Sequence, residues 1–184
     1  MIKTVEIGGD NPQFAASLLA CFKDMGLSPA DGNNTADMFV YIIDPPPCGR
    51  KAYADLLSGY QSTAIGLLEA VSRVLPRMDP GAGKRLCFIN RLSSSVNLAG
   101  VIEGGFERII SAACNMAVKT LFNRLRPAGY TFRLYGVENF ENKDECSYIA
   151  DYFIRNRSLE AESPIHSDEN RLVIRSRLEI EYPW

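Results

Sequence analysis

Residues 106–136 read FERIISAACNMAVKTLFNRLRPAGYTFRLYG. Apolar residues recur at helical spacing from Phe106 to Leu125, which predicts a long helix. Pro127 and Gly129 end this pattern, and the YTFRLYG that follows has the aromatic and branched residues of a strand. A helix that leads directly into a strand is half of a βαβ unit, so this stretch predicts a parallel sheet with helices packed on it.

The same alternation extends through the rest of the chain. Strands are predicted at KTVEIGG (3–9), DMFVYII (37–43), RLCFINRL (85–92) and, as one strand or a hairpin, RLVIRSRLEIEY (171–182). Helices are predicted from Asn11, as the cap, to Met25, from Tyr53 to Leu75 and from Tyr148 to Asn156. LSPADGNNTAD (27–37) is typical of a turn-rich loop. The order favours a three-layer, Rossmann-like sandwich with a mainly parallel sheet, formed as one domain over residues 1–184.

Composition excludes several classes of function. Hydrophobic residues make up 46% of the 184 residues and charged residues 23%, which is typical of a globular protein. The formal net charge is −2 and no basic stripe is present, so we expect neither a nucleic-acid partner nor a membrane partner. MIKTVEI lacks the regions of a signal peptide, which favours a cytoplasmic location. The five cysteines are widely spaced and there is one histidine, so no metal site is expected.

Several stretches between Leu57 and Gly136 resemble the short-chain dehydrogenase/reductase family. LLEAVSRVLPRM (67–78), GKRLCFINRLSSS (83–95) and SAACNMAVKTLFNRLRPAGYTFRL (111–134) follow the order and spacing of that family. KTVEIGGDNPQFAASLLA (3–20) is similar to its opening strand, glycine turn and first helix. The resemblance implies a Rossmann-type fold. It also implies that the second and third strands of the family are absent, because only 27–36 separates the first helix from DMFVYII.

The resemblance places three of the family's four catalytic positions on residues of other types. The family uses a tyrosine as general acid, a lysine one helical turn later that lowers the pKa of the phenol, a serine and an asparagine. In this chain the tyrosine position falls on Glu107, the lysine position on Ser111 and the asparagine position on Tyr60. The serine position keeps its type as Ser94, or as a neighbouring serine if the register slips. We therefore expect these positions to be inactive.

The resemblance places the dinucleotide turn at IGGDNPQFA (7–15). Gly8 and Gly9 can form the bend, but the later glycine positions of the family fall on Pro12 and Phe14. Proline removes an amide that would donate to a phosphate, and phenylalanine fills the space of a close backbone contact. The family's Asn-Asn-Ala-Gly segment is replaced here by IIDP (42–45), which contains Asp44. No cofactor is therefore expected, and NAD(P) is the expectation only if the chain is an active oxidoreductase.

Three functions remain open from the residues. The first is a non-catalytic member of the family that acts as an oligomeric scaffold or as a subunit that binds a ligand or partner. The second is an oxidoreductase with an altered site that uses Ser94 and Tyr60, or a hydrolase or lyase that uses Glu107. The third is a sensor whose small-molecule ligand binds at the carboxyl ends of the strands, near Gly8, Gly9, Asp44, Pro45, Ser93, Ser94 and Gly136. A crevice lined by polar groups favours the sensor, and one filled by Phe14 and the DPPP segment favours a scaffold.

Two expectations concern contacts with other elements or chains. The resemblance implies that the helices at 53–75 and 106–125 form dimer contacts. The helix at 106–125 also carries more apolar residues than one core-facing stripe requires, so we expect a homodimer or a hetero-oligomer with a family relative. With the second and third strands absent, KTVEI would be an edge of the sheet, which another element or subunit is expected to cover.

Overall fold

The fold was analysed in a computed structural model that describes residues 2–30, 35–46, 53–78, 83–91, 106–137, 139–142, 144–154 and 174–175. Its centre is a six-stranded parallel sheet in the order β2-β1-β3-β4-β5-β6. The strands are β1 (Thr4–Gly9), β2 (Ser28–Pro29), β3 (Met38–Ile42), β4 (Arg85–Arg91), β5 (Thr131–Val137) and β6 (Ile174–Arg175).

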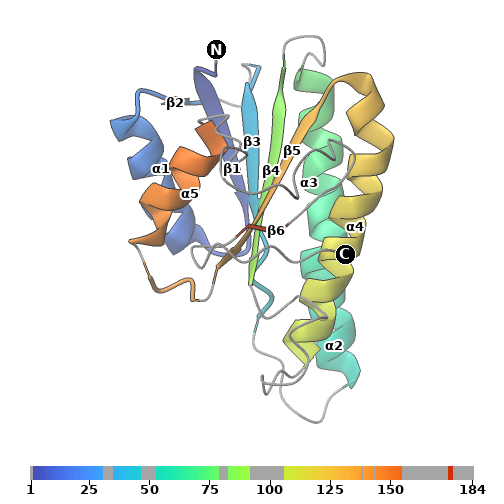
Figure 1. Ribbon diagram of the computed structural model, residues 1–184. Coiled ribbons are helices and arrows are strands. Elements are labelled where there is room, and N and C mark those ends of the chain that lie inside the picture. Colours follow the sequence, from blue (N-terminus) through green and yellow to red (C-terminus); the bar gives the residue numbers. More distant parts are fainter. Residues whose placement is uncertain are drawn as a thin grey trace, which may run out of the picture.

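Helices cover both faces of this sheet, so the molecule has three layers (Figure 1). One face carries α1 (Pro12–Asp24) and α5 (Glu145–Ile154). The other carries α2 (Tyr53–Tyr60), a π-helical turn (Gln61–Ile65), α3 (Gly66–Val74) and α4 (Phe106–Leu125). Short 3-10 turns, Leu75–Arg77 and Arg126–Ala128, follow α3 and α4. The prediction of a three-layer, Rossmann-like sandwich with a parallel sheet is confirmed.

Each helix layer encloses its own hydrophobic core. Phe14, Leu18 and Phe22 of α1 pack with residues of α5 against one face of the sheet. Ile110 and Val118 of α4 pack with residues of α3 against the other face. None of the helices described here is both long enough and apolar enough to cross a membrane.

Several predicted boundaries agree with the structure and others move. Asn11 caps α1 through its side-chain oxygen, which accepts a hydrogen bond of 2.9 Å from the amide of Phe14. The helix predicted at 53–75 is interrupted by the π-helical turn, and α5 begins three residues before the predicted start at Tyr148. Of the predicted strand or hairpin at 171–182, the described part is β6.

The expectation that the second strand of the family is absent was wrong. The segment predicted as a loop contributes β2, which pairs with β1 in parallel. The amide of Ser28 donates to the carbonyl of Lys3 at 2.9 Å, and the amide of Ala30 donates to that of Val5 at 2.8 Å. Pro29 lies between these two amides and needs no hydrogen bond of its own, which suits an edge strand. β2 therefore covers the part of β1 that was expected to need covering, and the described residues contain no strand beyond it.

The face of β1 that points toward α3 is polar. Glu6 accepts two hydrogen bonds of 2.8 Å from the guanidinium of Arg77. Glu6 and the neighbouring Gly8 line an open cleft of about 340 Å³ between β1 and α3, opposite Glu69 and Arg73. Val5 and Ile7, on the opposite face of the strand, pack toward α1. β1 thus has one apolar face and one face adapted to water.

Candidate functional site

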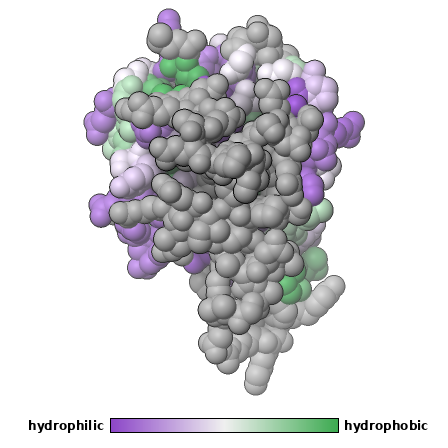
Figure 2. Space-filling model, in the orientation of Figure 1, coloured by the Kyte–Doolittle hydropathy of each residue, from purple (hydrophilic) through white to green (hydrophobic). Residues whose placement is uncertain are grey.

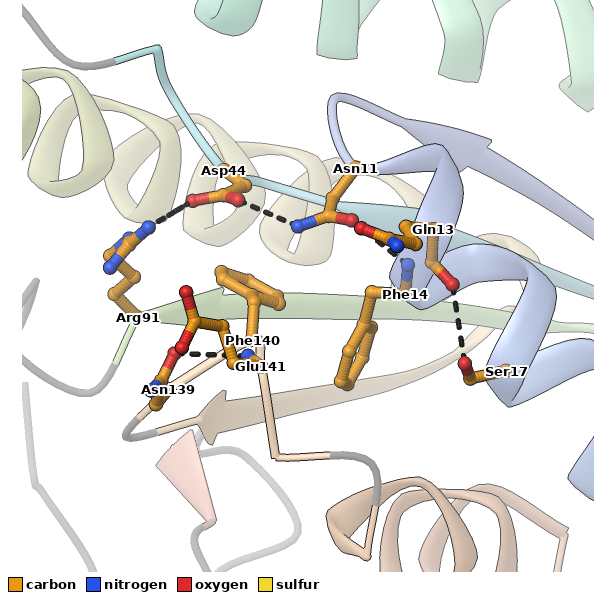
Figure 3. Close-up of a pocket in the computed structure, with 9 residues that line it drawn as sticks. All are labelled: Asn11, Gln13, Phe14, Ser17, Asp44, Arg91, Asn139, Phe140 and Glu141. Carbon is orange, nitrogen blue, oxygen red and sulfur yellow. Dashed lines mark hydrogen bonds and ion pairs between the residues drawn. The ribbon is translucent and has the colours of Figure 1, made fainter.

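A crevice lies at the carboxyl ends of the parallel strands, where ligands bind in proteins of this topology. It encloses about 420 Å³. Asn11, Gln13, Phe14 and Ser17 line it from the start of α1, Asp44 and Arg91 from the ends of β3 and β4, and residues 139–141 from the turn after β5. Most of these side chains are polar, although Phe14 and Phe140 are not (Figure 3).

Three polar side chains join the strand ends across this crevice. Asn11 Nδ2 donates to Asp44 Oδ2 at 2.8 Å, and Arg91 donates to Asp44 Oδ1 from Nε at 3.0 Å and from Nη2 at 2.6 Å. The Asp44 side chain is 15% exposed and the Arg91 side chain 40% exposed. We call this set Asn11–Asp44–Arg91 the crevice bridge. It links the first turn of α1 to the ends of β3 and β4.

Two aromatic rings fill the floor of the crevice below the bridge. Phe14 and Phe140 meet edge to face, with ring centroids 5.1 Å apart. Both residues are buried, and the guanidinium of Arg91 lies 5.5 Å above the Phe140 ring. This contact fixes Arg91 between an aromatic face and a carboxylate. Hence the floor presents little apolar surface to a ligand.

The turn between β1 and α1 is held close to β3. Gly9 has φ of +122°, and a Cβ atom there would lie 2.1 Å from the carbonyl oxygen of Ile42. The amide of Asp10 donates to that same oxygen at 3.0 Å. Only glycine therefore fits at position 9. At Gly8 an added Cβ would make ordinary contacts with Phe39 and Tyr41.

Asp10 lies beside the bridge in an unfavourable electrostatic setting. Burial is the largest cause that raises the pKa of Asp10, and the charge of Asp44 also raises it, while the backbone amide of Asp44 and the Thr63 hydroxyl act to lower it. Together these effects raise the pKa from 3.8 to about 6. Thr63 belongs to the π-helical turn and is fully buried. Asp10 Oδ2 and Thr63 Oγ1 both lack a partner at full hydrogen-bonding geometry within the described residues.

The turn does not fit the pyrophosphate of a dinucleotide. Phosphate binding at a helix start needs amides that point at the ligand. Pro12 has no amide hydrogen, and the Phe14 amide donates to the Asn11 side chain at 2.9 Å, so two amide positions of the first turn cannot donate to a phosphate. Asp10 adds a carboxylate at the same place, and Phe14 occupies the space next to the turn.

The residues predicted as sites lie in different places. Gly8 and Gly9 end β1 and Asp44 follows β3, so all three lie at the carboxyl edge of the sheet. Gly8 and Gly9 line the cleft beside α3, however, whereas Asp44 lines the crevice. Tyr60, at the end of α2, is 42% exposed. Glu107 lies partly buried in the first turn of α4, one turn before Ser111. Ser94 lies outside the residues that the structure describes.

Ser111, at the predicted lysine position, belongs to a buried polar contact. Asn90 at the end of β4 donates from Nδ2 to the carbonyl oxygen of Ser111 at 2.9 Å and to Asn115 Oδ1 at 2.7 Å. Ser111 is 1% exposed, and Asn90 and Asn115 are 0% exposed. The three residues therefore pack α4 on β4 with neutral groups.

The described residues hold no group of three or more His, Cys, Asp or Glu side chains placed to bind a metal ion.

The sequence interpretation missed the crevice bridge, Phe140 and Asn90. Asp44 directly follows a predicted strand and Arg91 lies near the end of the next, and the carboxyl ends of neighbouring parallel strands share one edge of the sheet. That placement was the available signal for their pairing. Asn90 and Phe140 gave no comparable signal.

Comparisons with known proteins agree with this architecture. No family model matches the chain. A protein named C-signal from Myxococcus xanthus is 35% identical over 80 residues, a match that covers 42% of this chain and 47%, or about half, of that protein's length. A carbonyl reductase from Pseudomonas aeruginosa PAO1, solved in complex with NADP, superposes with a TM-score of 0.70 at 13% identity over 100% of both chains. Enoyl-[acyl-carrier-protein] reductase (NADH) from Aquifex aeolicus VF5 gives 0.67 at 13% identity over 82% of this chain and 88% of its own. At these identities the solved structures establish the fold alone, and the chain has the Rossmann-type fold of the short-chain dehydrogenase/reductase family, as the sequence resemblance predicts.

Proposed function

We propose that this chain is a non-catalytic protein on the short-chain dehydrogenase scaffold, and that it binds a small ligand or a partner subunit. The observation that carries the proposal is the closed turn between β1 and α1. Pro12 has no amide hydrogen, the Phe14 amide is engaged by the Asn11 side chain, and Phe14 and Phe140 occupy the floor beside the turn. A dinucleotide would have to displace both the rings and the crevice bridge.

The residues at the family's catalytic positions support the same conclusion. Reduction of a carbonyl requires a proton donor at the oxygen, and a phenol donates well only when a nearby cation lowers its pKa. Ser111 is neutral and buried against Asn90, so the position one turn after Glu107 holds no cation. Glu107 thus lacks the lysine that accompanies the tyrosine in the family.

Titration of the purified chain with NADH and NADPH tests this proposal. Calorimetry or cofactor fluorescence is expected to detect no binding up to millimolar cofactor. The carbonyl reductase that was solved with NADP is the positive control. Binding with a micromolar dissociation constant would refute the proposal.

A second candidate function is an NAD(P)-dependent oxidoreductase with an altered active site. It is favoured by the full-length superposition on a carbonyl reductase in complex with NADP. In that case NADPH oxidation with a panel of carbonyl substrates would be measurable, and Tyr60→Phe or Ser94→Ala would abolish it. Activity unaffected by both substitutions would exclude this active site.

We also infer that the chain forms a dimer, or a hetero-oligomer with a family relative, through α2, α3 and α4. Large apolar side chains are exposed along these helices and the π-helical turn between α2 and α3, at Leu57, Tyr60, Ile65, Leu68, Ile109 and Met116. Figure 2 shows hydrophobic surface, in green, on the side of the molecule where α2 and α4 lie. Burying such a patch would favour association.

Sedimentation at micromolar concentration tests the assembly. Wild type is expected at twice the monomer mass, and the double variant Ile109→Glu, Met116→Glu at the monomer mass. Met25→Glu, at an exposed apolar residue after α1, is the matched control and should not change the mass. A monomeric wild type would contradict the inference of a dimer.

A further inference from the structure

The crevice of about 420 Å³ has the size of a small-molecule site, and its lining favours one class of ligand. We propose that it binds a small hydroxyl-rich molecule, of the carbohydrate or polyol class, and discriminates against the phosphate ester of the same molecule. The inference rests on the proposed function, because a crevice occupied by a dinucleotide would have no room for this ligand.

The first argument is the charge of the lining. The described lining contains two carboxylates, Asp44 and Glu141, and one cation, Arg91. Asp44 and Arg91 are paired at 2.6 Å, so the charge that remains is the exposed carboxylate of Glu141. A phosphate group would meet this negative charge, and a neutral ligand would not. The crevice therefore has the wrong sign for the anion that the fold family binds there.

The second argument is the set of hydrogen-bonding groups on opposite walls of the crevice. The wall formed by α1 presents the side-chain amide of Gln13 and the hydroxyl of Ser17. The Ser17 hydroxyl donates its proton to the main-chain carbonyl of Gln13 at 3.3 Å. On the other wall, the Asn139 oxygen accepts the amide of Glu141 at 2.9 Å, which leaves the Asn139 NH2 group as a donor. The Glu141 carboxylate is an acceptor on the same wall (Figure 3). Neutral donors next to acceptors match hydroxyl groups, each of which donates and accepts at once.

The third argument is the absence of an accessible apolar floor within the described lining. Phe14 is 2% exposed and Phe140 6% exposed, because the two rings cover each other and Arg91 covers Phe140. A ligand in the crevice would therefore meet mainly polar atoms. An apolar ligand would lose more hydration of these groups than it could recover by contact.

The test uses the full chain labelled with ¹⁵N, and ribose, glucose, mannitol, ribose 5-phosphate and glucose 6-phosphate as probes. At least one unphosphorylated probe is expected to shift the amide resonances of Gln13, Ser17 and Glu141 with a millimolar dissociation constant. The phosphate ester of a sugar that binds is expected to bind about tenfold more weakly. Equal or tighter binding of the ester, or no shift with any probe, would overturn the proposal.

Two surface variants and a control locate the effect. Glu141→Gln keeps the size of the side chain and removes its charge, so discrimination against the ester should fall from about tenfold to about threefold or less. Gln13→Ala should weaken binding of the unphosphorylated sugar by at least threefold. Glu69→Gln, which lies in the cleft on the other face of the sheet, should change neither value. Identical binding by all three variants would refute the assignment of the site.

The same sample titrated with NADH separates the two proposals. Micromolar NADH binding would refute the proposed function whatever the sugars do. If neither NADH nor any of the sugars binds detectably, only the ligand class inferred here would be refuted.

Discussion

Replacing Asp10 by asparagine removes a carboxylate that the fold holds partly away from water and next to Asp44. Because burial raises the pKa of Asp10 from 3.8 to about 6, the native state retains this proton to a higher pH than the unfolded chain does. The free energy of unfolding should therefore contain a favourable contribution below about pH 4, which is lost as the pH rises from about 4 to about 6. A shift of about two pKa units corresponds to about 3 kcal/mol, and partial solvent exposure reduces this to about 1.5 kcal/mol.

Urea denaturation followed by circular dichroism between pH 4 and pH 7.5 measures this contribution. Asp10→Asn should match wild type near pH 4 and exceed its free energy of unfolding by about 1.5 kcal/mol at pH 7.5. Asp24→Asn is the control, because Asp24 is an exposed carboxylate at the end of α1. Its pH dependence above pH 5 should follow that of wild type. An Asp10→Asn protein that is less stable than wild type at pH 7.5 would refute the reasoning.

Three further substitutions and one control test individual features of the fold by urea denaturation. Gly9→Ala should lower the free energy of unfolding by about 3 kcal/mol or more, because its Cβ would lie 2.1 Å from a backbone oxygen at a φ that side chains avoid. Gly26→Ala, with φ of +86° and open space around it, should cost about 1 kcal/mol, and equal losses would contradict the steric argument. Asp37→Ala should cost about 2 kcal/mol because it strands the buried ammonium of Lys84, 2.6 Å away. Burial acts to raise the pKa of Asp37, but the Lys84 contact and backbone amides outweigh it and lower the pKa to about 2. Wild type should therefore lose more stability than the variant as the pH falls from about 4 to about 2. Arg91→Ala should cost about 1–2 kcal/mol through loss of the crevice bridge, and no loss would show that the bridge is not stabilising.

The layers of the fold could be predicted because each element carries its own periodic signal. The helix predicted over Phe106 to Leu125 has the same bounds as α4, and the strand at DMFVYII contains β3, whose residues are all buried. β2 could not be predicted in this way. It is two residues long and includes Pro29, and its hydrogen bonds depend on the carbonyls of Lys3, just before β1, and of Val5 in β1.

The candidate site was only partly predictable for a related reason. Gly9 and Asp44 could be placed at the carboxyl edge of the sheet from strand order alone. The crevice bridge joins Asn11 to Asp44 over 33 positions and Asp44 to Arg91 over 47, so no local pattern contains it. Side-chain rotamers and tertiary packing decide such a contact. The position of Arg91 also depends on the Phe140 ring beneath its guanidinium.

The polar face of β1 has a consequence for how this sheet can grow. A helix added over that face would have to enclose the Glu6–Arg77 ion pair, whose members are now 28% and 24% exposed. Withdrawing both charges from water would cost several kcal/mol before any new apolar contact formed. The ion pair therefore discourages further layers on this flank, and an engineer who wished to enlarge the domain there would first have to neutralise it.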